Sequence, residues 1–289
     1  MTQLIPPPAD DPRPPRRFRL RRRVILLLAI LVIWQGAIRR PTPHLSGTSL
    51  NPVEHPAPYS RATLRVATFN IAGGVSPTDN RLDLDRTARY LHNFDIIGMQ
   101  EVHGIGFFEW RDQARILGES LHMPWLFAAS ESRWWCESFG NGVLCDLPVT
   151  QWDRFPLNSS ISQSNRTLLR VIAQWQGRPL TVLITHLDRH EDHEIELGAA
   201  ISALMDSPEP AILLGDLNID AGSDAPLKAL RADPKVTDAL GIALGANMPA
   251  ESNDWIFARG LRCIGGGLTD NDASDHKLAW AELAPGGPE

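Results

Sequence analysis

Short apolar segments of strand length, each next to a polar side chain, are the feature that most constrains this sequence. Such runs are typical of strands buried on both faces, because those strands are hydrophobic throughout. Amphipathic stretches such as "RLDLDRTARYLHNF" separate them, so we expect sheets flanked by helices. The polar residues beside the apolar runs are Asn70, Glu101, His186, Asp216, Asn218, Asp275 and His276. One such ending indicates a turn, whereas five endings indicate a shared site.

The stretch "AILLGDLNID" shows this pattern most clearly. Gly215 interrupts the apolar run, and residues two apart in an extended chain point to the same side. Asp216 and Asn218 would therefore project together beyond the end of a strand. In a second interpretation the two residues form a turn or a helix start and satisfy only backbone donors.

The N-terminal 61 residues differ from the rest of the chain. A basic segment, residues 1–23, contains seven arginines and runs into an apolar stretch, residues 24–38, that two further arginines follow. Fifteen residues are fewer than the roughly 20 of a comfortable membrane span, so this is either a short transmembrane helix or a signal peptide. Because the stretch lacks a good cleavage site, we predict an uncleaved signal anchor. Its arginines place the N-terminus in the cytoplasm and the main domain outside, in the periplasm or the extracellular space.

Residues 39–61 are rich in proline, serine and threonine, and are predicted to be a tether. Residues 62–289 form the main domain and carry 18 basic and 31 acidic residues. That balance disfavours tight electrostatic binding of nucleic acid but leaves a metal-assisted nuclease open. Cys136, Cys145 and Cys263 have no metal-binding spacing; Cys136 and Cys145 are a candidate disulfide that the sequence leaves undecided.

Ordered motifs across the main domain resemble those of the endonuclease/exonuclease/phosphatase superfamily of metal-dependent phosphodiesterases. The motifs run in order from Thr68 to His276 and read "TFNIAG", "MQEV", "FGNGVL", "NRTLLRV", "THLD", "GDLN", "NDWIF" and "SDH". The resemblance implies an α/β fold, a deoxyribonuclease-like four-layer sandwich of two packed mixed sheets flanked by helices. The N-terminal membrane segment would precede this sandwich.

The resemblance also implies a metal site. Glu101 matches the principal Mg²⁺ ligand of the family, and Asn70 and Asp275 complete the shell. Hard oxygen ligands suit Mg²⁺, with Mn²⁺ as the alternative ion. Taken alone, Glu101 equally fits the first turn of a helix, where carboxylates are common.

The catalytic groups implied by the resemblance surround the phosphate. His276 matches the histidine that contacts the scissile phosphate, and Asp254 the carboxylate that hydrogen-bonds it. Asp216 would orient or deprotonate the attacking water. Asn218 and His186 would stabilise the transition state from opposite sides. By itself, Asp254 equally fits a capping residue, and His186 a histidine satisfied at a strand end.

Substrate contacts are less well defined. Asn141 and Arg166 match positions that contact the substrate phosphate, although Arg166 also fits a structural partner of nearby acids. The chain departs from its relatives at "FGNGVLCDLP", where Phe139 replaces a tyrosine, and Cys145 and Asp146 replace serine and arginine. A phosphate-binding hydroxyl and a cation are therefore expected to be absent here.

Two further stretches admit two interpretations each. Trp134 and Trp135 are either core residues or aromatic side chains exposed at a membrane or substrate face. In "DRHEDHE", His190 and His193 fit a second metal site, but a solvated helix start is favoured.

The sequence predicts a membrane-tethered, monomeric, divalent-metal-dependent phosphodiesterase. Its substrate is a phosphate ester, either nucleic acid or a phospholipid head group. Two alternatives are a catalytically silent binding domain on the same fold and a structural protein of the cell envelope.

Overall fold

The computed structural model describes residues 16–52, 61–105, 112–157, 164–190, 192–219, 225–249 and 252–286. The chain divides into two compact units, residues 1–38 and 39–289. In the first unit, helix α1 (Arg16–Ala37) contains most of the apolar stretch, and its large apolar side chains from Val24 to Trp34 are exposed. Within the described residues, no helix combines the length and apolarity that a membrane crossing needs. The transmembrane anchor predicted over residues 24–38 stays a prediction.

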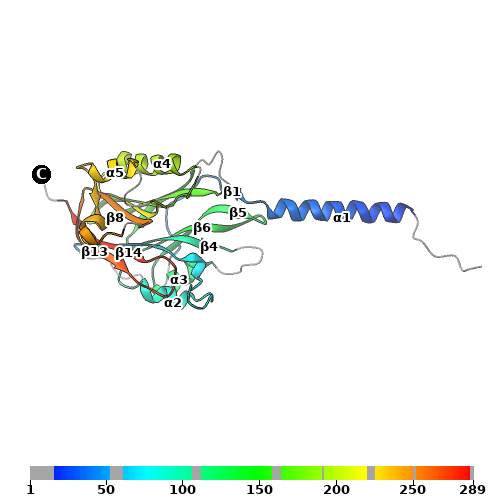
Figure 1. Cartoon of the computed structure of the whole chain (residues 1–289), viewed down its shortest axis with the longest axis horizontal. Helices are drawn as coiled ribbons and strands as arrows, with labels where there is room; N and C mark the ends of the chain where they lie inside the picture. The colour runs from blue at the N-terminus through cyan, green and yellow to red at the C-terminus, as the bar shows by residue number, and fades with distance from the viewer. Residues whose placement is uncertain are drawn as a thin grey trace, which may run out of the picture. The chain divides into compact units, whose positions relative to one another are not determined.

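The second unit is built on two seven-stranded mixed sheets (Figure 1). The first sheet contains, in spatial order, β1 (Arg40–Pro41), β5 (Trp125–Arg133), β6 (Cys136–Cys145), β4 (Ile96–His103), β3 (Leu64–Asn70), β14 (Leu278–Pro285) and β13 (Leu261–Thr269). The second contains β11 (Thr237–Asp238), β12 (Asp254–Arg259), β10 (Ala211–Asp216), β9 (Arg178–His186), β8 (Arg166–Trp175), β7 (Val149–Leu157) and β2 (Leu45–Gly47). Only β3 with β4 and β9 with β10 pair in parallel among the described strands.

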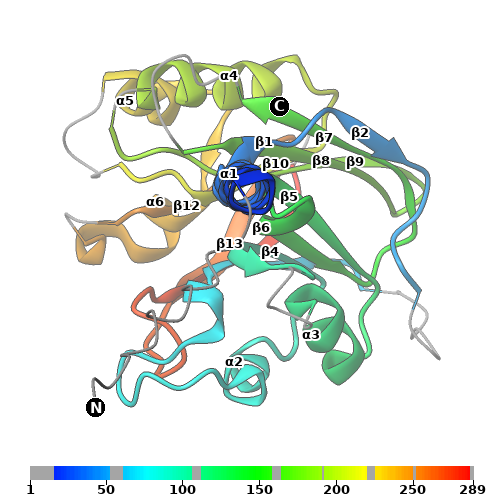
Figure 2. The ribbon, with the colours of Figure 1, turned by 90° about the vertical axis from the view of Figure 1, so that its right-hand side faces the viewer.

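Helices cover the outer face of each sheet, which makes four layers (Figure 2). The first sheet is covered by α2 (Leu84–Tyr90) and α3 (Gln113–Leu121), and the second by α4 (His193–Asp206) and α5 (Ala225–Ala232). The short helices α6 (Ala239–Leu244), η1 (Ala72–Gly74) and η2 (Gly245–Asn247) complete the unit. The predicted α/β sandwich of two packed mixed sheets is therefore confirmed.

The central strands are apolar throughout because both of their faces are buried. In β10, Ile212 and Leu214 enter the core between the sheets, whereas Ala211 and Leu213 enter the core under the outer helices. Gly98 of β4 lies at a close approach of the two sheets, since a Cβ atom there would collide with the Leu214 side chain. The strand-end residues consequently meet at one edge of this narrow interface.

Residues 40–47 belong to the folded body. Arg40 of β1 pairs with Ser132 at one edge of the first sheet, and Leu45 of β2 pairs with Arg154 at one edge of the second. Residues 39–61 were predicted to be a tether. Residues 40–47 instead form backbone hydrogen bonds with both sheets, and these bonds order them although they bury little apolar surface. The part of that prediction over residues 53–60 lies outside the described residues.

The hairpin between β5 and β6 turns at Trp134 and Trp135. Both have positive φ, 54° and 60°, as two-residue hairpin turns require. Trp135 is 66% exposed and Trp134 is half-buried, so the exposed interpretation holds for Trp135. Cys136 and Cys145 stand at opposite ends of β6, and all three cysteines are free. The candidate disulfide is therefore absent, because nine residues of extended chain span roughly 30 Å.

The "DRHEDHE" stretch leads into a helix, as favoured from the sequence, and Arg189, His190 and Glu194 are exposed while two acids are not. Asp192 precedes α4, and both Asp192 and Glu196 are fully buried. His193 Nδ1 lies 2.7 Å from the Asp188 carbonyl oxygen, whereas His190 is exposed. Burial raises the pKa of Glu196 to about 7, against smaller effects of a hydrogen bond from Asp188 N and of Arg166.

Candidate active site

The parallel strands β3 and β4 bring Asn70 and Glu101 together. Asn70 pairs with Gln100, and a β-bulge between Met99 and Val102 interrupts the pairing of β4 with β6. At this bulge Glu101 adopts a left-handed backbone with φ of 57°, a conformation that is costly for a residue with a side chain. Its Oε1 accepts a hydrogen bond from Asn70 Nδ2 at 3.1 Å. The bulge therefore fixes the direction of the carboxylate.

The parallel strands β9 and β10 bring His186 and Asp216 into register. A Cβ atom at Gly215 would collide with the Thr185 carbonyl, so glycine is required for the strands to approach this closely. Asp216 Oδ2 accepts a hydrogen bond from Asn70 Nδ2 at 3.0 Å, across the two sheets. Its Oδ1 accepts one from the Asn218 backbone N–H at 3.0 Å. Asp216 thus ends a strand, as the first interpretation of "GDLN" predicts, and it also accepts from a backbone N–H in a turn, as the second interpretation predicts.

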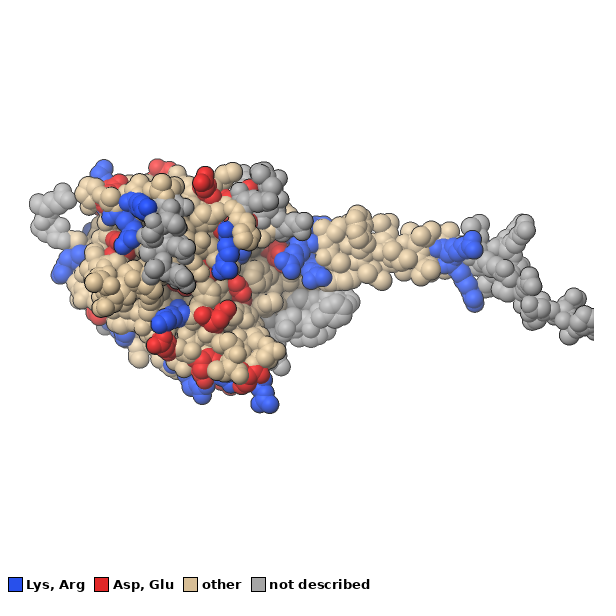
Figure 3. Space-filling model, in the orientation of Figure 1, with Lys and Arg blue, Asp and Glu red and all other residues tan. Residues whose placement is uncertain are grey.

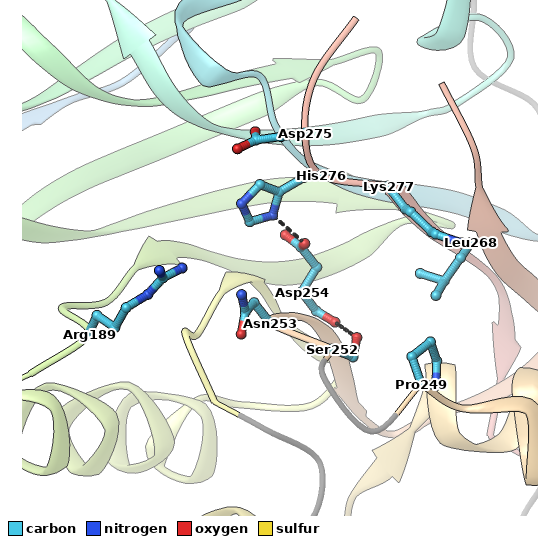
Figure 4. Close-up of a pocket in the computed structure, with 9 residues that line it drawn as sticks. All are labelled: Arg189, Pro249, Ser252, Asn253, Asp254, Leu268, Asp275, His276 and Lys277. Carbon is cyan, nitrogen blue, oxygen red and sulfur yellow. Dashed lines mark hydrogen bonds and ion pairs between the residues drawn. The ribbon is translucent and has the colours of Figure 1, made fainter. Parts of the chain in front are cut away.

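His276 and Asp254 form a pair in which Asp254 is buried and His276 is partly exposed (Figure 4). His276 Nδ1 donates to Asp254 Oδ2 at 2.8 Å. Desolvation lowers the pKa of His276, but the hydrogen bond and charge of Asp254, with the charges of Asp216 and Asp275, outweigh it and raise the pKa to about 9. Burial raises the pKa of Asp254 to about 6, against the opposing effect of His276. Both groups are therefore charged at neutral pH.

His186 is held in the opposite state. Burial, followed by the charges of Arg166, His276 and Arg189, keeps the pKa of His186 well below its ordinary value. Arg166 donates from one guanidinium nitrogen to His186 Nδ1 at 3.0 Å. Because Nδ1 is the acceptor, the proton of the neutral ring is on Nε2, which lies 3.5 Å from Asp216 Oδ2. Arg166 thus contacts the histidine that is predicted to stabilise the transition state, and its own contact with the substrate phosphate stays a prediction.

Ser274 joins the "SDH" loop to the end of β3. Its hydroxyl donates to the Asn70 carbonyl at 2.6 Å, lies 3.3 Å from Asp275 Oδ1, and accepts from the His276 backbone N–H at 3.1 Å. Ser274 had no predicted role, although it belongs to the "SDH" motif. This serine positions both neighbouring residues.

Asn141, a predicted site residue, and Arg189, which had no predicted role, each form side-chain hydrogen bonds. Asn141 is buried and donates from Nδ2 to the Thr167 carbonyl at 3.1 Å, which links β6 of one sheet to β8 of the other. This bond fixes the direction of the Asn141 side chain, and its contact with the substrate phosphate stays a prediction. Arg189, which the sequence analysis did not single out, donates from Nε to Asn218 Oδ1 at 3.2 Å. Asn218 Nδ2 also donates to the Leu187 carbonyl at 2.8 Å.

The oxygen atoms of Asn70 and Glu101 fit a hard divalent cation. Asn70 Oδ1 accepts from the Ala72 N–H and retains a second lone pair, and its amide group touches the Glu101 carboxylate. A second group of ligand atoms, from Asp216, Asp254 and His276, lies within 4.8 Å. In this second group, however, one ligand atom is an imidazole nitrogen, and His276 Nδ1 is already bonded to Asp254 Oδ2 at 2.8 Å, whereas a hard cation prefers oxygen ligands. We therefore favour the Asn70 and Glu101 side of the site.

Comparisons with known proteins agree with this geometry. The sequence model of the Endonuclease/Exonuclease/phosphatase family matches residues 67–276. A comparison with curated proteins gives no significant match.

Solved structures of similar fold include three with low sequence identity. An endonuclease/exonuclease/phosphatase from Bacteroides vulgatus has a TM-score of 0.61 and 20% identity, over 78% of this chain and 100% of that one. A humanized TDP2 of D. rerio has a TM-score of 0.58 and 17% identity, over 77% and 99%. Sphingomyelinase C from Streptomyces griseocarneus has a TM-score of 0.54 and 15% identity, over 78% and 100%. These likenesses establish a shared fold, and with the family match over most of the chain the conclusion is plain: the chain belongs to the endonuclease/exonuclease/phosphatase family.

Proposed function

We propose that this protein is a divalent-metal-dependent phosphodiesterase that hydrolyses a phosphate ester by direct attack of water. The observation that carries the proposal is the pair of imidazoles on either side of Asp216. His186 Nε2 lies 3.5 Å and His276 Nε2 3.8 Å from Asp216 Oδ2. One ring is neutral and the other protonated, and titratable groups whose pKa values are pushed apart are typical of catalytic sites.

Each group has a role in the proposed reaction. Asp216 takes a proton from the water whose oxygen forms the new bond to phosphorus, while the bond to the leaving oxygen breaks. The His276 imidazolium, held by Asp254, binds a charged phosphoryl oxygen from one side. From the other side, His186 donates from Nε2 and Asn218 from its amide to the charge that develops on the oxygens.

Glu101, Asn70 and Asp275 are the residues that would hold Mg²⁺ or Mn²⁺. When bound, such an ion polarises a phosphoryl oxygen and offsets its charge. Support comes from the hard oxygen donors of all three side chains and from the direct contact of Asn70 with Glu101.

The test is hydrolysis by the full chain of plasmid DNA, sphingomyelin and bis(p-nitrophenyl) phosphate, with Mg²⁺ or with EDTA. We expect activity that EDTA removes and that Asp216→Asn lowers by about a thousandfold. Asp85→Asn, which changes an exposed carboxylate of α2, is the matched control and should retain activity. A folded protein that binds Mg²⁺ calorimetrically but hydrolyses none of the three would contradict the proposal and favour a silent binding domain.

The cellular location is part of the proposal. The seven arginines before the apolar stretch, against two after it, favour a cytoplasmic N-terminus and an extracytoplasmic catalytic unit attached to the membrane. Treating intact cells with protease checks this location. Cleavage of the catalytic unit without lysis is expected, and protection of that unit would contradict it.

A further inference from the structure

A cavity of about 360 Å³ lies beside the His276–Asp254 pair (Figure 4). That volume is within the range of small-ligand sites. Asp254, Asp275 and His276 form one wall, and Asn70, Glu101, His186, Asp216 and Asn218 are not part of the lining. The cavity therefore adjoins the His276 end of the site and not the end formed by Glu101, His186 and Asp216.

Arg189 is a cation at this cavity. Its guanidinium group is directed toward His276, and its Nε is held by Asn218 Oδ1 at 3.2 Å (Figure 4). Within the described part of the chain, the other two guanidinium nitrogens of Arg189 make no ion pair with a carboxylate. Its charge also contributes to the lowered pKa of His186, which agrees with this placement.

Lys277 supplies a second positive charge to the lining. It pairs with Asp270 at 2.8 Å, but Asp270 is 86% exposed and Lys277 is 56% exposed, so the pair is weak. Of the two carboxylates in the lining, Asp254 binds His276 through Oδ2, while its Oδ1 has no hydrogen-bond partner among the described residues. Asp275 is assigned to the proposed metal shell. Apolar atoms of Pro249 and Leu268 complete the cavity and suit an uncharged linking group.

We propose that this cavity is a subsite for a second anionic group of the substrate, a phosphate that flanks the scissile one, and that Arg189 binds it. The inference rests on the proposed phosphodiesterase function and names its substrate class. Arg forms bidentate contacts with phosphate. A quaternary ammonium head group would instead meet two positive charges there, so choline lipids are disfavoured.

Binding experiments test the subsite without catalysis. Calorimetry of the full chain with thymidine 3′,5′-bisphosphate and with thymidine 5′-monophosphate should give about tenfold or more tighter binding of the bisphosphate. Arg189→Gln should reduce that ratio to about threefold or less, because the second phosphate loses its guanidinium partner. Arg178→Gln, an exposed arginine at the opposite end of β9 from His186, is the control and should leave the ratio unchanged. Equal binding of both ligands by the unaltered protein would overturn the proposal.

Hydrolysis separates recognition of the flanking phosphate from positioning of Asn218. The substrates are dithymidine monophosphate with and without a terminal phosphate, and a glycerophosphoinositol with and without a ring phosphate. Arg189→Gln should lower kcat/KM about tenfold more for the phosphorylated member, and the pair with the larger difference identifies the source of the second phosphate. An equal loss on both members would mean that Arg189 only positions Asn218, and the subsite would be rejected. Failure to hydrolyse any diester, with the binding preference retained, would reject the phosphodiesterase function alone.

Discussion

The two sheets contribute different chemistry to one site. From the first sheet come the oxygen donors Asn70 and Glu101, together with the loop that carries Asp275 and His276 before β14. From the second sheet come His186, Asp216, Asn218 and Asp254, to which the proposed mechanism assigns the water proton, the developing charge and the support of His276. Neither set is complete without the other.

The contacts between these sets cross from sheet to sheet. Asn70 of the first sheet donates to Asp216 of the second, and His276 before β14 donates to Asp254 of β12. The proposed reaction therefore depends on the packing of the two sheets. Substitutions in the residues of each sheet, and at the interface between the sheets, test whether the two sets of residues act separately.

The largest effects are expected from Glu101→Gln and Asp216→Asn. Each should lower kcat by about a thousandfold, because each removes a charge that acts on the transition state. Raising Mg²⁺ should partly restore Glu101→Gln, whose loss is in metal affinity, but should not restore Asp216→Asn. Measurement of kcat across a magnesium titration checks this difference, and identical magnesium dependence of both variants would refute the division of roles.

The interface between the sheets is tested by Gly98→Ala. The new Cβ would collide with Leu214 and crowd Ile184, which should lower the free energy of unfolding by about 3 kcal/mol. Gly198→Ala in α4 is the matched control, since nothing lies within 4 Å of its Cβ position. It should stabilise the protein by roughly 0.5 to 1 kcal/mol. Denaturant unfolding measures both, and equal stability of the two variants would contradict the close approach.

The helix layer of the second sheet contains a pH-sensitive group. The pKa of Glu196 is raised from its ordinary value near 4.5 to about 7 in the folded state. The protonated side chain therefore contributes its full stability below pH 4.5, and this contribution is lost as the pH rises through about 7. Glu196→Gln, which mimics the protonated form, should therefore stabilise the protein at pH 8, on the order of 2 kcal/mol, and much less near pH 4.5. Thermal unfolding at both pH values checks the sign; a stabilisation that does not depend on pH would be inconsistent with this cause.

The smallest effect concerns the pair that joins the sheets at His276. Activity that needs the imidazolium should fall as the pH rises through about 9. Asp254→Asn removes the main cause of the raised pKa, so the alkaline limb of kcat/KM should move toward neutral pH. Relative to its own activity at the pH optimum, the variant should therefore lose about tenfold more activity at pH 8 than the unaltered protein does. An alkaline limb that stays in place would show that Asp254 does not control the protonation of His276.

The sequence was sufficient for the strands and for most of the residues that meet at their ends. Continuous apolar runs predicted β3, β4, β9 and β10, because strands buried on both faces need such runs. Parallel pairing then places Asn70 beside Glu101 and His186 beside Asp216. These contacts follow from local pattern and general sheet geometry.

Other parts depend on tertiary contacts that no local pattern encodes. The left-handed backbone of Glu101 arises from a bulge against β6, and Arg166 reaches His186 only because β8 and β9 are neighbours. Arg40 and Leu45 lie in a proline-rich stretch that resembles a linker, yet each finds a strand edge. On the face seen in Figure 3, basic and acidic side chains are interspersed over the folded body.

The strand order has a practical consequence for how the protein can be shortened. The family match begins at residue 67 and ends at residue 276, so a version trimmed to it would lack β1, β2 and β14. Removal of β14 would separate β3 from β13, and removal of β1 and β2 would uncover β5 and β7. Newly exposed strand edges pair with other chains. Such a version should aggregate although it keeps every catalytic residue, and recombinant boundaries are better set at residues 39 and 286.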